Sequence, residues 1–215
     1  MAKVKISKKS NRIDMTAMCD VAFLLLSFFV MTATAKQPEP KPVDTPASTV
    51  LLKLPEEGVA VITVGDKQVF YSIPRVARVR TLERIDAKYK IGFTPAEYKS
   101  FEGMEGFGVP LNKLKGLLAL KGEARNKAGV QPGIPYDSIN DQLTDWIKES
   151  REAVKESLDE RINSGEKDVV YKDMDVAIKG DAKEDYPTIK RVIDILQDQK
   201  KNKFFLVTGL RNEDF

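Results

Sequence analysis

The strongest feature of the hydrophobic pattern is a nearly continuous apolar run at residues 15–35, MTAMCDVAFLLLSFFVMTATA, in which Asp20 is the only charged side chain. At about 1.5 Å of rise per residue, a helix of this length measures about 30 Å, which is the thickness of the hydrocarbon core of a bilayer. The pattern therefore predicts a transmembrane helix at residues 15–35.

A proline-rich segment follows the apolar run and contains Pro38, Pro40, Pro42 and Pro46. This spacing disfavours helix and sheet and favours an extended polyproline-like chain, because proline has no backbone N–H to donate. Such a segment reaches up to about 43 Å at 3.1 Å per residue. We predict a linker at residues 36–49, which serves either as a mobile arm for a distal domain or as a passive spacer.

The remaining residues, 50–215, predict a small α/β domain that opens with strands. Apolar runs at residues 50–55, 59–64 and 69–72 are typical of strands. Gly65 followed by Asp66 predicts the turn of a hairpin between the last two runs.

The C-terminal region predicts a strand, a helix and a strand. Strand patterns at residues 174–179 and 204–208 flank a helix that opens at Pro187, and the apolar residues of that helix repeat at i, i+3, i+4 and i+7. This order is typical of a βαβ unit. The predicted fold is therefore an α/β domain with helices on a mixed sheet.

A longer amphipathic helix is predicted from about Ser138 to Asn163. Asp137 is its N-cap candidate, Gly165 is its stop signal, and Ile139 begins its apolar face.

The formal net charge of the 215-residue chain is +3, and the positive excess lies in the first residues. The tail at residues 1–14 has a charge of +4, against −1 for the rest of the chain, and contains Lys3, Lys5, Lys8, Lys9, Arg12 and Asp14. The positive-inside rule places such a tail in the cytoplasm, so the domain is predicted to lie outside. We expect no nucleic-acid partner, since binding to phosphates needs a basic face on the folded domain.

The chain contains no His and a single Cys, Cys19, which excludes most familiar catalytic and metal-binding groups. Without imidazole there is no Ser-His or Cys-His pair, and nearly every kind of zinc site is excluded. Cys19 lies in the apolar run and cannot form an internal disulfide. We therefore expect no enzyme, no metal site and no cofactor.

Asp20 is the residue with the most distinctive chemistry, because an ionisable group in a membrane helix is costly and usually functional. Helical steps place Thr16 and Ser27 on the face of its carboxylate, where they line a hydrated path or drive self-association as a dimer. Apolar surroundings favour the neutral carboxyl and polar ones the carboxylate, so Asp20 could load and release a proton. The alternative is a structural ion pair with a Lys or Arg of a neighbouring subunit.

Two other functions fit parts of this pattern. Ala33-Thr34-Ala35 fits the cleavage site of a secretory signal, and cleavage there would release a secreted protein. Against this, Asp20 has no use in a segment that is removed, and it lowers the tendency to insert by about 2.5 to 3.5 kcal/mol. The second is a membrane-anchored binding protein that uses the helix only as a tether and transports no ion.

The run Asp14-Met15-Thr16-Ala17-Met18-Cys19-Asp20 before an apolar helix resembles the start of the ExbD/TolR family, in which a Thr lies four residues before the single membrane Asp. Thr16 and Asp20 keep both positions, whereas Asp14 and Ala17 replace the Asn and Pro usual in that motif.

The order of the predicted strands extends the resemblance to residues 12–72 and 168–210. The family's periplasmic domain begins with a strand that ends in Leu-Pro, as at Leu54-Pro55, and finishes with a strand, a helix and a strand that ends near Val-Thr, as at Thr208.

The resemblance implies a subunit of an ion-driven motor in the cell inner membrane, with Asp20 as the proton carrier. The helix would sit in a ring of ExbB-like subunits, and the motor would drive a TonB-like energy transducer for uptake across the outer membrane. The chain would cross the membrane once, with its N-terminus cytoplasmic and its domain periplasmic. The alternative is TolR-like service in envelope maintenance.

Residues 75–135 form an insertion relative to shorter members of the family. Arg75, Arg78, Arg80 and Arg84 are spaced to form a basic helix face, and residues 111–118 predict a short amphipathic helix. We expect a solvated face with a locally packed helix. The alternative is a binding surface for the cell wall, that is, for peptidoglycan, or for another subunit.

Overall fold

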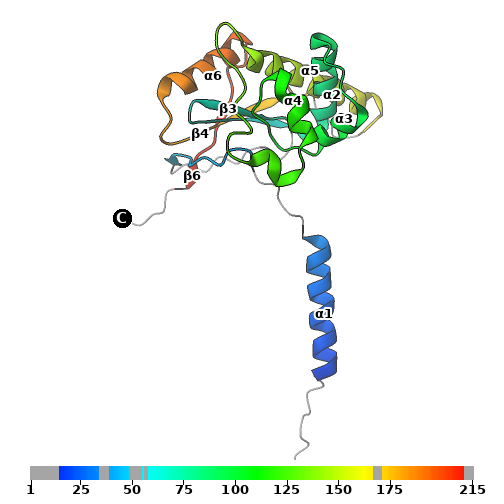
Figure 1. The fold of residues 1–215 in the computed structure, drawn as a ribbon. Coiled ribbons are helices and arrows are strands. Elements are labelled where there is room, and N and C mark those ends of the chain that lie inside the picture. The colour runs from blue at the N-terminus through cyan, green and yellow to red at the C-terminus, as the bar shows by residue number, and fades with distance from the viewer. Residues whose placement is uncertain (1–14, 34–38, 49–54, 56–57, 167–170, 211–215) are drawn as a thin grey trace, which may run out of the picture. The chain divides into compact units, whose positions relative to one another are not determined.

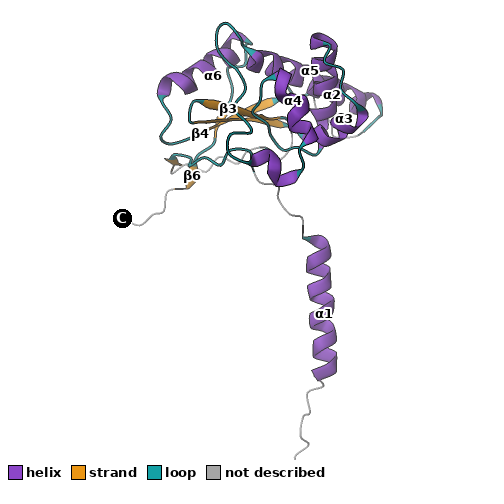
Figure 2. Ribbon diagram, in the orientation of Figure 1, coloured by secondary structure: helices purple, strands orange, loops and turns teal. Residues whose placement is uncertain are grey.

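The structure, a computed structural model, describes residues 15–33, 39–48, 55, 58–166 and 171–210. The chain forms two compact units, Met1–Gln37 and Pro38–Phe215. The described part of the first unit is helix α1 (Met15–Thr32), which occupies most of the predicted membrane span. The second unit is a small α/β domain, as predicted (Figures 1 and 2).

A four-stranded mixed sheet forms the centre of the domain, in the order β3-β2-β4-β5. β2 (Val59–Gly65) pairs antiparallel with β3 (Gln68–Ser72) and parallel with β4 (Asp175–Gly180). β4 pairs parallel with β5 (Phe205–Leu206). The predicted hairpin and the predicted pairing of the two C-terminal strands are confirmed, although β5 is shorter than the pattern at residues 204–208 suggests.

The hairpin turns at Asp66 and Lys67, one residue later than predicted. Both residues have positive φ angles, of 52° and 57°. Two consecutive left-handed residues are the central pair of a type I′ turn, which matches the twist of the flanking strands.

The two faces of the sheet have different surroundings. Every second residue of β2, from Ala60 to Val64, is fully buried, and the residues between are half-buried. Helices α5 (Gln142–Asn163) and α6 (Tyr186–Asp198) lie on one side of the sheet, whereas β6 (Gly209–Leu210) lies on the other (Figure 1). The helices therefore cover the fully buried face.

Residues 75–135, predicted to be an insertion and called the insertion below, are part of the core of the domain. Phe101 and Phe107 pack against Trp146 of α5, with ring centroids 6.0 and 4.6 Å apart. The predicted helix at residues 111–118 is confirmed. The elements of the insertion are the 3-10 helices η1 (Arg75–Ala77) and η2 (Gly122–Asn126) and the α-helices α2 (Arg78–Tyr89), α3 (Pro95–Glu102) and α4 (Leu111–Ala119).

The insertion also covers one edge of the sheet. Tyr71 of β3 exchanges two backbone hydrogen bonds with Phe107, of 2.8 and 3.0 Å. The backbone N–H of Ile134 donates to the carbonyl of Val69 at 2.7 Å. Because an open edge strand invites pairing with other chains, these contacts protect the β3 edge.

Helix α3 was not predicted from the sequence, although it carries a complete capping box. The side chain of Thr94 accepts a hydrogen bond from the backbone N–H of Glu97, and the carboxylate of Glu97 accepts one from the backbone N–H of Thr94. Pro95 occupies the first turn. The Thr-Pro-x-Glu pattern was the local signal for this helix.

Helix α5 begins at Gln142, four residues later than predicted. Asp141, and not Asp137, is its N-cap, because the Asp141 carboxylate accepts hydrogen bonds from both the backbone N–H and the hydroxyl of Thr144, at 3.0 and 2.6 Å. Ile139, expected on the apolar face of the helix, is fully exposed.

Acidic residues of α5 pair with two of the four arginines of the predicted basic face, whereas Arg75 is exposed and Arg78 donates to backbone carbonyls. Arg84 donates to Glu149 at 2.8 Å and to Glu156 at 2.7 Å. Arg80 donates to both carboxylate oxygens of Glu160 at 2.7 Å. Arg80 and Arg84 are therefore paired by a helix that is distant in sequence, which the sequence pattern did not predict. The binding-surface alternative stays a prediction.

Part of the predicted linker lies on the domain. β1 (Ala47–Ser48) pairs parallel with β6 in a second, two-stranded sheet. The prediction that this segment stays out of any sheet is therefore wrong at its end, where the residues after Pro46 have backbone N–H groups to donate. The strand predicted at residues 50–55 lies outside the described residues, except for Pro55.

Candidate functional site

Helix α1 carries the three residues that the sequence singled out, Thr16, Asp20 and Ser27. At about 100° per residue, Thr16 and Ser27 lie about 40° and 20° from Asp20 around the helix axis, and about 6 and 11 Å from it along the axis. A carboxyl and two hydroxyl groups thus share one face of the helix. Their role in proton transfer stays a prediction.

Hydroxyl groups of α1 are oriented by the backbone of the helix itself. Ser27 Oγ donates to the carbonyl of Leu24 at 2.9 Å, and Thr32 Oγ1 donates to the carbonyl of Phe28 at 2.8 Å. A hydroxyl that donates in this way keeps its lone pairs as acceptors. Ser27 therefore offers an acceptor for water on the face of Asp20. Because α1 contains no Lys or Arg, an ion-pair partner for Asp20 has to come from outside this helix.

No residue of α1 is buried within the described structure. Its 18 residues have a mean hydropathy of 1.9, and by length and composition the helix is suited to cross a membrane. Large apolar side chains are exposed along it from Met15 to Met31. Lipid or another protein must cover this surface, because an apolar surface of this extent is unfavourable in water.

A second face of α1 combines small and apolar side chains. A shallow hollow on this face is lined by Ala17, Met18, Val21, Ala22 and Leu25. The small side chains of Ala17 and Ala22 allow the backbone of a neighbouring helix to approach. The hollow is centred about 130° from Asp20 around the axis, so this face and the polar face are separate.

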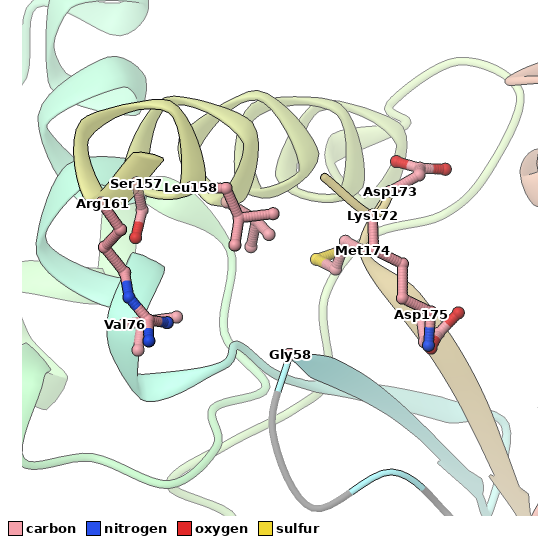
Figure 3. A pocket seen from close by; sticks show the side chains of 10 residues that line it. Gly58, Val76, Ser157, Leu158, Arg161, Lys172, Asp173, Met174 and Asp175 are labelled. Atoms are coloured by element: carbon pink, nitrogen blue, oxygen red, sulfur yellow. The ribbon is translucent and has the colours of Figure 1, made fainter. Parts of the chain in front are cut away.

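The domain contains a pocket of about 180 Å³ between α5, η1, Gly58 just before β2, and the chain that leads into β4 (Figure 3). Leu158 and Met174 point into it (Figure 3). Val76 and Val154 add further apolar lining. The pocket is smaller than the roughly 300 Å³ at which small-molecule sites begin, so its size suits a single apolar side chain.

Charged residues around the pocket already pair with neighbours. Arg161 donates to Glu166 through two hydrogen bonds, of 2.7 and 2.8 Å. Lys172 pairs with Asp175 at 2.6 Å. These pairs neutralise the rim, so the pocket offers no excess charge to attract an ionic ligand.

Asp173, on the chain before β4, connects three parts of the domain. It accepts hydrogen bonds from Arg151 of α5 and from Lys201, both at 3.0 Å. Burial by itself raises the pKa of Asp173, but the hydrogen bonds from Arg151 and Lys201 outweigh it and hold the pKa below its usual value. Asp173 is therefore a structural carboxylate.

Tyr71 and Ser150 form a polar contact inside the core, with their oxygens 2.6 Å apart and both residues fully buried. Ser150 Oγ donates to the carbonyl of Ile147 at 2.9 Å, so Tyr71 is the donor to Ser150. Burial raises the pKa of Tyr71 well above its usual value and keeps the phenol protonated. This contact stabilises the fold and is not placed for chemistry on a ligand.

The side chains that could bind a metal ion are dispersed in the part of the chain that the structure describes. Within those residues, no group of three or more His, Cys, Asp or Glu side chains is placed to hold a metal ion. The distinctive chemical group of the described chain is thus the carboxyl of Asp20 on an apolar helix.

Comparisons with known proteins give one match. A family model described as "Biopolymer transport protein ExbD/TolR" matches residues 7–210, which is nearly the whole chain. Comparisons with curated proteins and with solved structures found no match.

Proposed function

Because the chain belongs to the ExbD/TolR family of biopolymer transport proteins, we propose that it is an ExbD-like subunit of a proton-driven motor that uses Asp20 as its proton carrier. The family as a whole supplies subunits of motors that energise biopolymer transport, together with ExbB- or TolQ-like and TonB- or TolA-like partners. The match covers both α1 and the domain, so the proposal concerns the whole architecture.

The observation that carries the proposal is the isolation of Asp20. It is the only ionisable acid of α1, and two hydroxyl-bearing residues share its face. A carboxyl with no basic residue on its own helix changes protonation state as its surroundings change from apolar to hydrated. Thr16 and Ser27 supply polar partners on the hydrated side.

The proposed arrangement places residues 1–14 in the cytoplasm, α1 in the inner membrane within a ring of ExbB-like subunits, and the domain in the periplasm. Two copies of α1 associate as a dimer, since polar groups in a membrane need partners. The motion that proton flow produces is passed to a TonB-like transducer for uptake across the outer membrane. The subunit catalyses no reaction of its own.

Asp20→Asn tests this proposal. Asn keeps the volume and most hydrogen bonds of a protonated Asp but cannot release a proton. The driving force is worth about 2.3 kcal/mol per charge per 100 mV, so a carrier that cannot ionise abolishes coupling and does not merely slow it. In cells where this chain is the sole copy, we expect energised uptake across the outer membrane to be lost, while expression and assembly with the ring subunit stay normal.

Cys19→Ser is the matched control, because it changes a neighbouring side chain of the same helix and leaves the carboxyl in place; uptake should be unchanged. Asp20→Glu should keep a small part of the uptake, since it keeps an ionisable group at a shifted position. Normal uptake with Asp20→Asn would reject the proton-carrier role. Loss of the ring subunit on affinity purification would instead favour a structural ion pair.

A further inference from the structure

Residues 39–48, here called the strap, lie on the domain near the hairpin turn and are held there by two ion pairs. Glu39 pairs with Lys179 of β4 at 2.5 Å, and Lys41 pairs with Asp66 in the hairpin turn. Lys179 alternates along β4 with the buried Ile178, so it lies on the face of the sheet opposite the helices. The strap therefore contacts the face that α5 and α6 leave uncovered.

Two backbone hydrogen bonds hold the second half of the strap. The N–H of Ala182 donates to the carbonyl of Asp44 at 2.7 Å, and the N–H of Gly209 donates to the carbonyl of Pro46 at 3.0 Å. Both donors belong to the folded domain and both acceptors to the strap. The protection of these two amides from solvent thus reports whether the strap is docked.

Two glycines of the domain allow the strap to approach closely. A Cβ atom at Gly65 would lie 2.8 Å from Cγ1 of Val43, and one at Gly106 would lie 3.3 Å from Cγ of Pro40. Gly65 is not among the residues with positive φ. A larger residue is therefore excluded at position 65 by the strap itself and not by the backbone conformation.

The same contacts are weak enough to open. No residue of the strap is buried, and its ion pairs are partly exposed, where such pairs contribute little. β1 and β6 pair over only two residues each. A hollow of about 120 Å³ lies beneath the start of the strap, lined by Pro40, Thr63, Phe70 and Lys179 among others. Few buried contacts and a short ladder mark a segment at the low end of local stability.

Release of the strap changes how far the domain can extend from α1. With the strap docked, six residues, 33–38, connect α1 to the first docked residue, and they span at most about 20 Å. Release adds ten residues, or about 30 Å at 3.1 Å per residue. The prolines of the strap keep it extended in both states, so docking costs little chain entropy.

We propose that the strap is a releasable latch that sets the reach of the domain, docked on the sheet in one state and free in the other. Its role in the motor rests on the proposed function, whereas its release is a property of the folded chain alone. The latch gives the motor a short state and an extended state without any change in the fold of the domain.

Hydrogen exchange on the full chain in detergent tests the release. We expect the Ala182 and Gly209 amides to exchange at least about 100-fold faster than the Ile62 amide of β2, through local opening. In Gly65→Ala, these two amides should exchange at least about tenfold faster than in the wild-type chain, because the new methyl group displaces Val43. Val43→Ala in the Gly65→Ala background removes that clash and should restore part of the protection.

Gly116→Ala is the matched control for this measurement, since a Cβ at that position meets nothing within 4 Å. It should leave both amides unchanged. Exchange of Ala182 and Gly209 only through global unfolding, or no effect of Gly65→Ala on them, would overturn the latch.

A disulfide lock tests the role of the latch in transport. The Cβ atoms of positions 43 and 65 lie at most about 4.3 Å apart, since Cγ1 is one bond from Cβ, and this separation suits a disulfide. In a Cys19→Ala background, the Val43→Cys and Gly65→Cys pair should block energised uptake when oxidised and restore it on reduction. In each single Cys variant, the oxidant should leave energised uptake unchanged.

Normal uptake by the oxidised pair would reject the latch as a working part of the motor. The exchange measurement needs no transport, so failure of the Asp20→Asn experiment would reject the proposed function and leave the latch standing. Conversely, if the Ala182 and Gly209 amides exchange slowly while Asp20→Asn abolishes uptake, the latch is rejected and the proposed function stands.

Discussion

Single polar side chains connect parts of this domain that are distant in sequence. Lys201, after α6, is only 7% exposed, and its ammonium group meets the carboxylate of Asp173 before β4. Arg151 of α5 binds the same carboxylate. A charged group at this depth is stable only with its partner, so the three residues act as one unit.

Asp173→Asn tests this unit, because it removes the charge and keeps the shape. We expect the free energy of unfolding at pH 7 to fall by about 1 kcal/mol, a value discounted for the partial exposure of Asp173. The folded-state pKa lies below the unfolded one, so the stabilisation exists above the unfolded pKa and is lost as pH falls through the folded pKa. Urea denaturation from pH 7 down to about pH 2.5 should show the two proteins converging.

Asp137→Asn serves as the control for this prediction, because Asp137 is exposed and lies before the first turn of α5. It should change the stability little at any pH. A stability difference between wild type and Asp173→Asn that stays constant in acid would show that packing, and not charge, is responsible.

Residues 75–135, the predicted insertion, fit the central sheet through close backbone contacts. Gly108 is the tightest of these, since a Cβ atom there would lie 2.2 Å from Cδ1 of Phe70. The N–H of Gly108 donates to Oε1 of Gln131 at 2.7 Å, which keeps the loop in place. The insertion therefore packs so closely against β3 at Gly108 that a Cβ atom at this position would clash with Phe70.

Gly108→Ala should lower the free energy of unfolding by about 1 to 3 kcal/mol, because the methyl group overpacks the contact with Phe70. Gly116→Ala, on the exposed side of α4, should instead raise it by up to about 1 kcal/mol, because Ala favours helix over Gly. Chemical denaturation followed by circular dichroism measures both. Equal stability of the two variants would contradict the close seating of the insertion.

The whole chain combines one helix suited to a membrane with one compact domain. The basic tail at residues 1–14 favours a cytoplasmic N-terminus, so the domain is expected on the opposite side.

A reporter enzyme that folds only where disulfides form, fused after residue 40, should be active in cells, since that point is expected outside the cytoplasm. The full chain should also resist extraction by alkali and keep its N-terminus in the membrane fraction. Activity of a reporter restricted to the cytoplasm would reject this orientation. A mature N-terminus at Lys36 would show that residues 1–35 are a cleaved signal.

The sequence by itself determined the features that depend on short stretches of chain. The apolar run predicted α1, two short apolar runs and a Gly-Asp turn signal predicted the hairpin of β2 and β3, and helical periodicity predicted α6 between β4 and β5. Spacing alone also placed Asp20, Thr16 and Ser27 on one face of that helix, while their role stays a prediction.

Only the tertiary structure decided the features that need a distant partner. Arg80 is neutralised by a residue 80 positions away, and Lys179 meets Glu39 across 140 positions. The start of α5 was decided by Asp141, and not Asp137, accepting the hydrogen bond from the Thr144 N–H. No local pattern encodes such pairings, because they form only when the fold brings the groups together. The docked strap is the most extensive example, since several long-range contacts hold it on the domain.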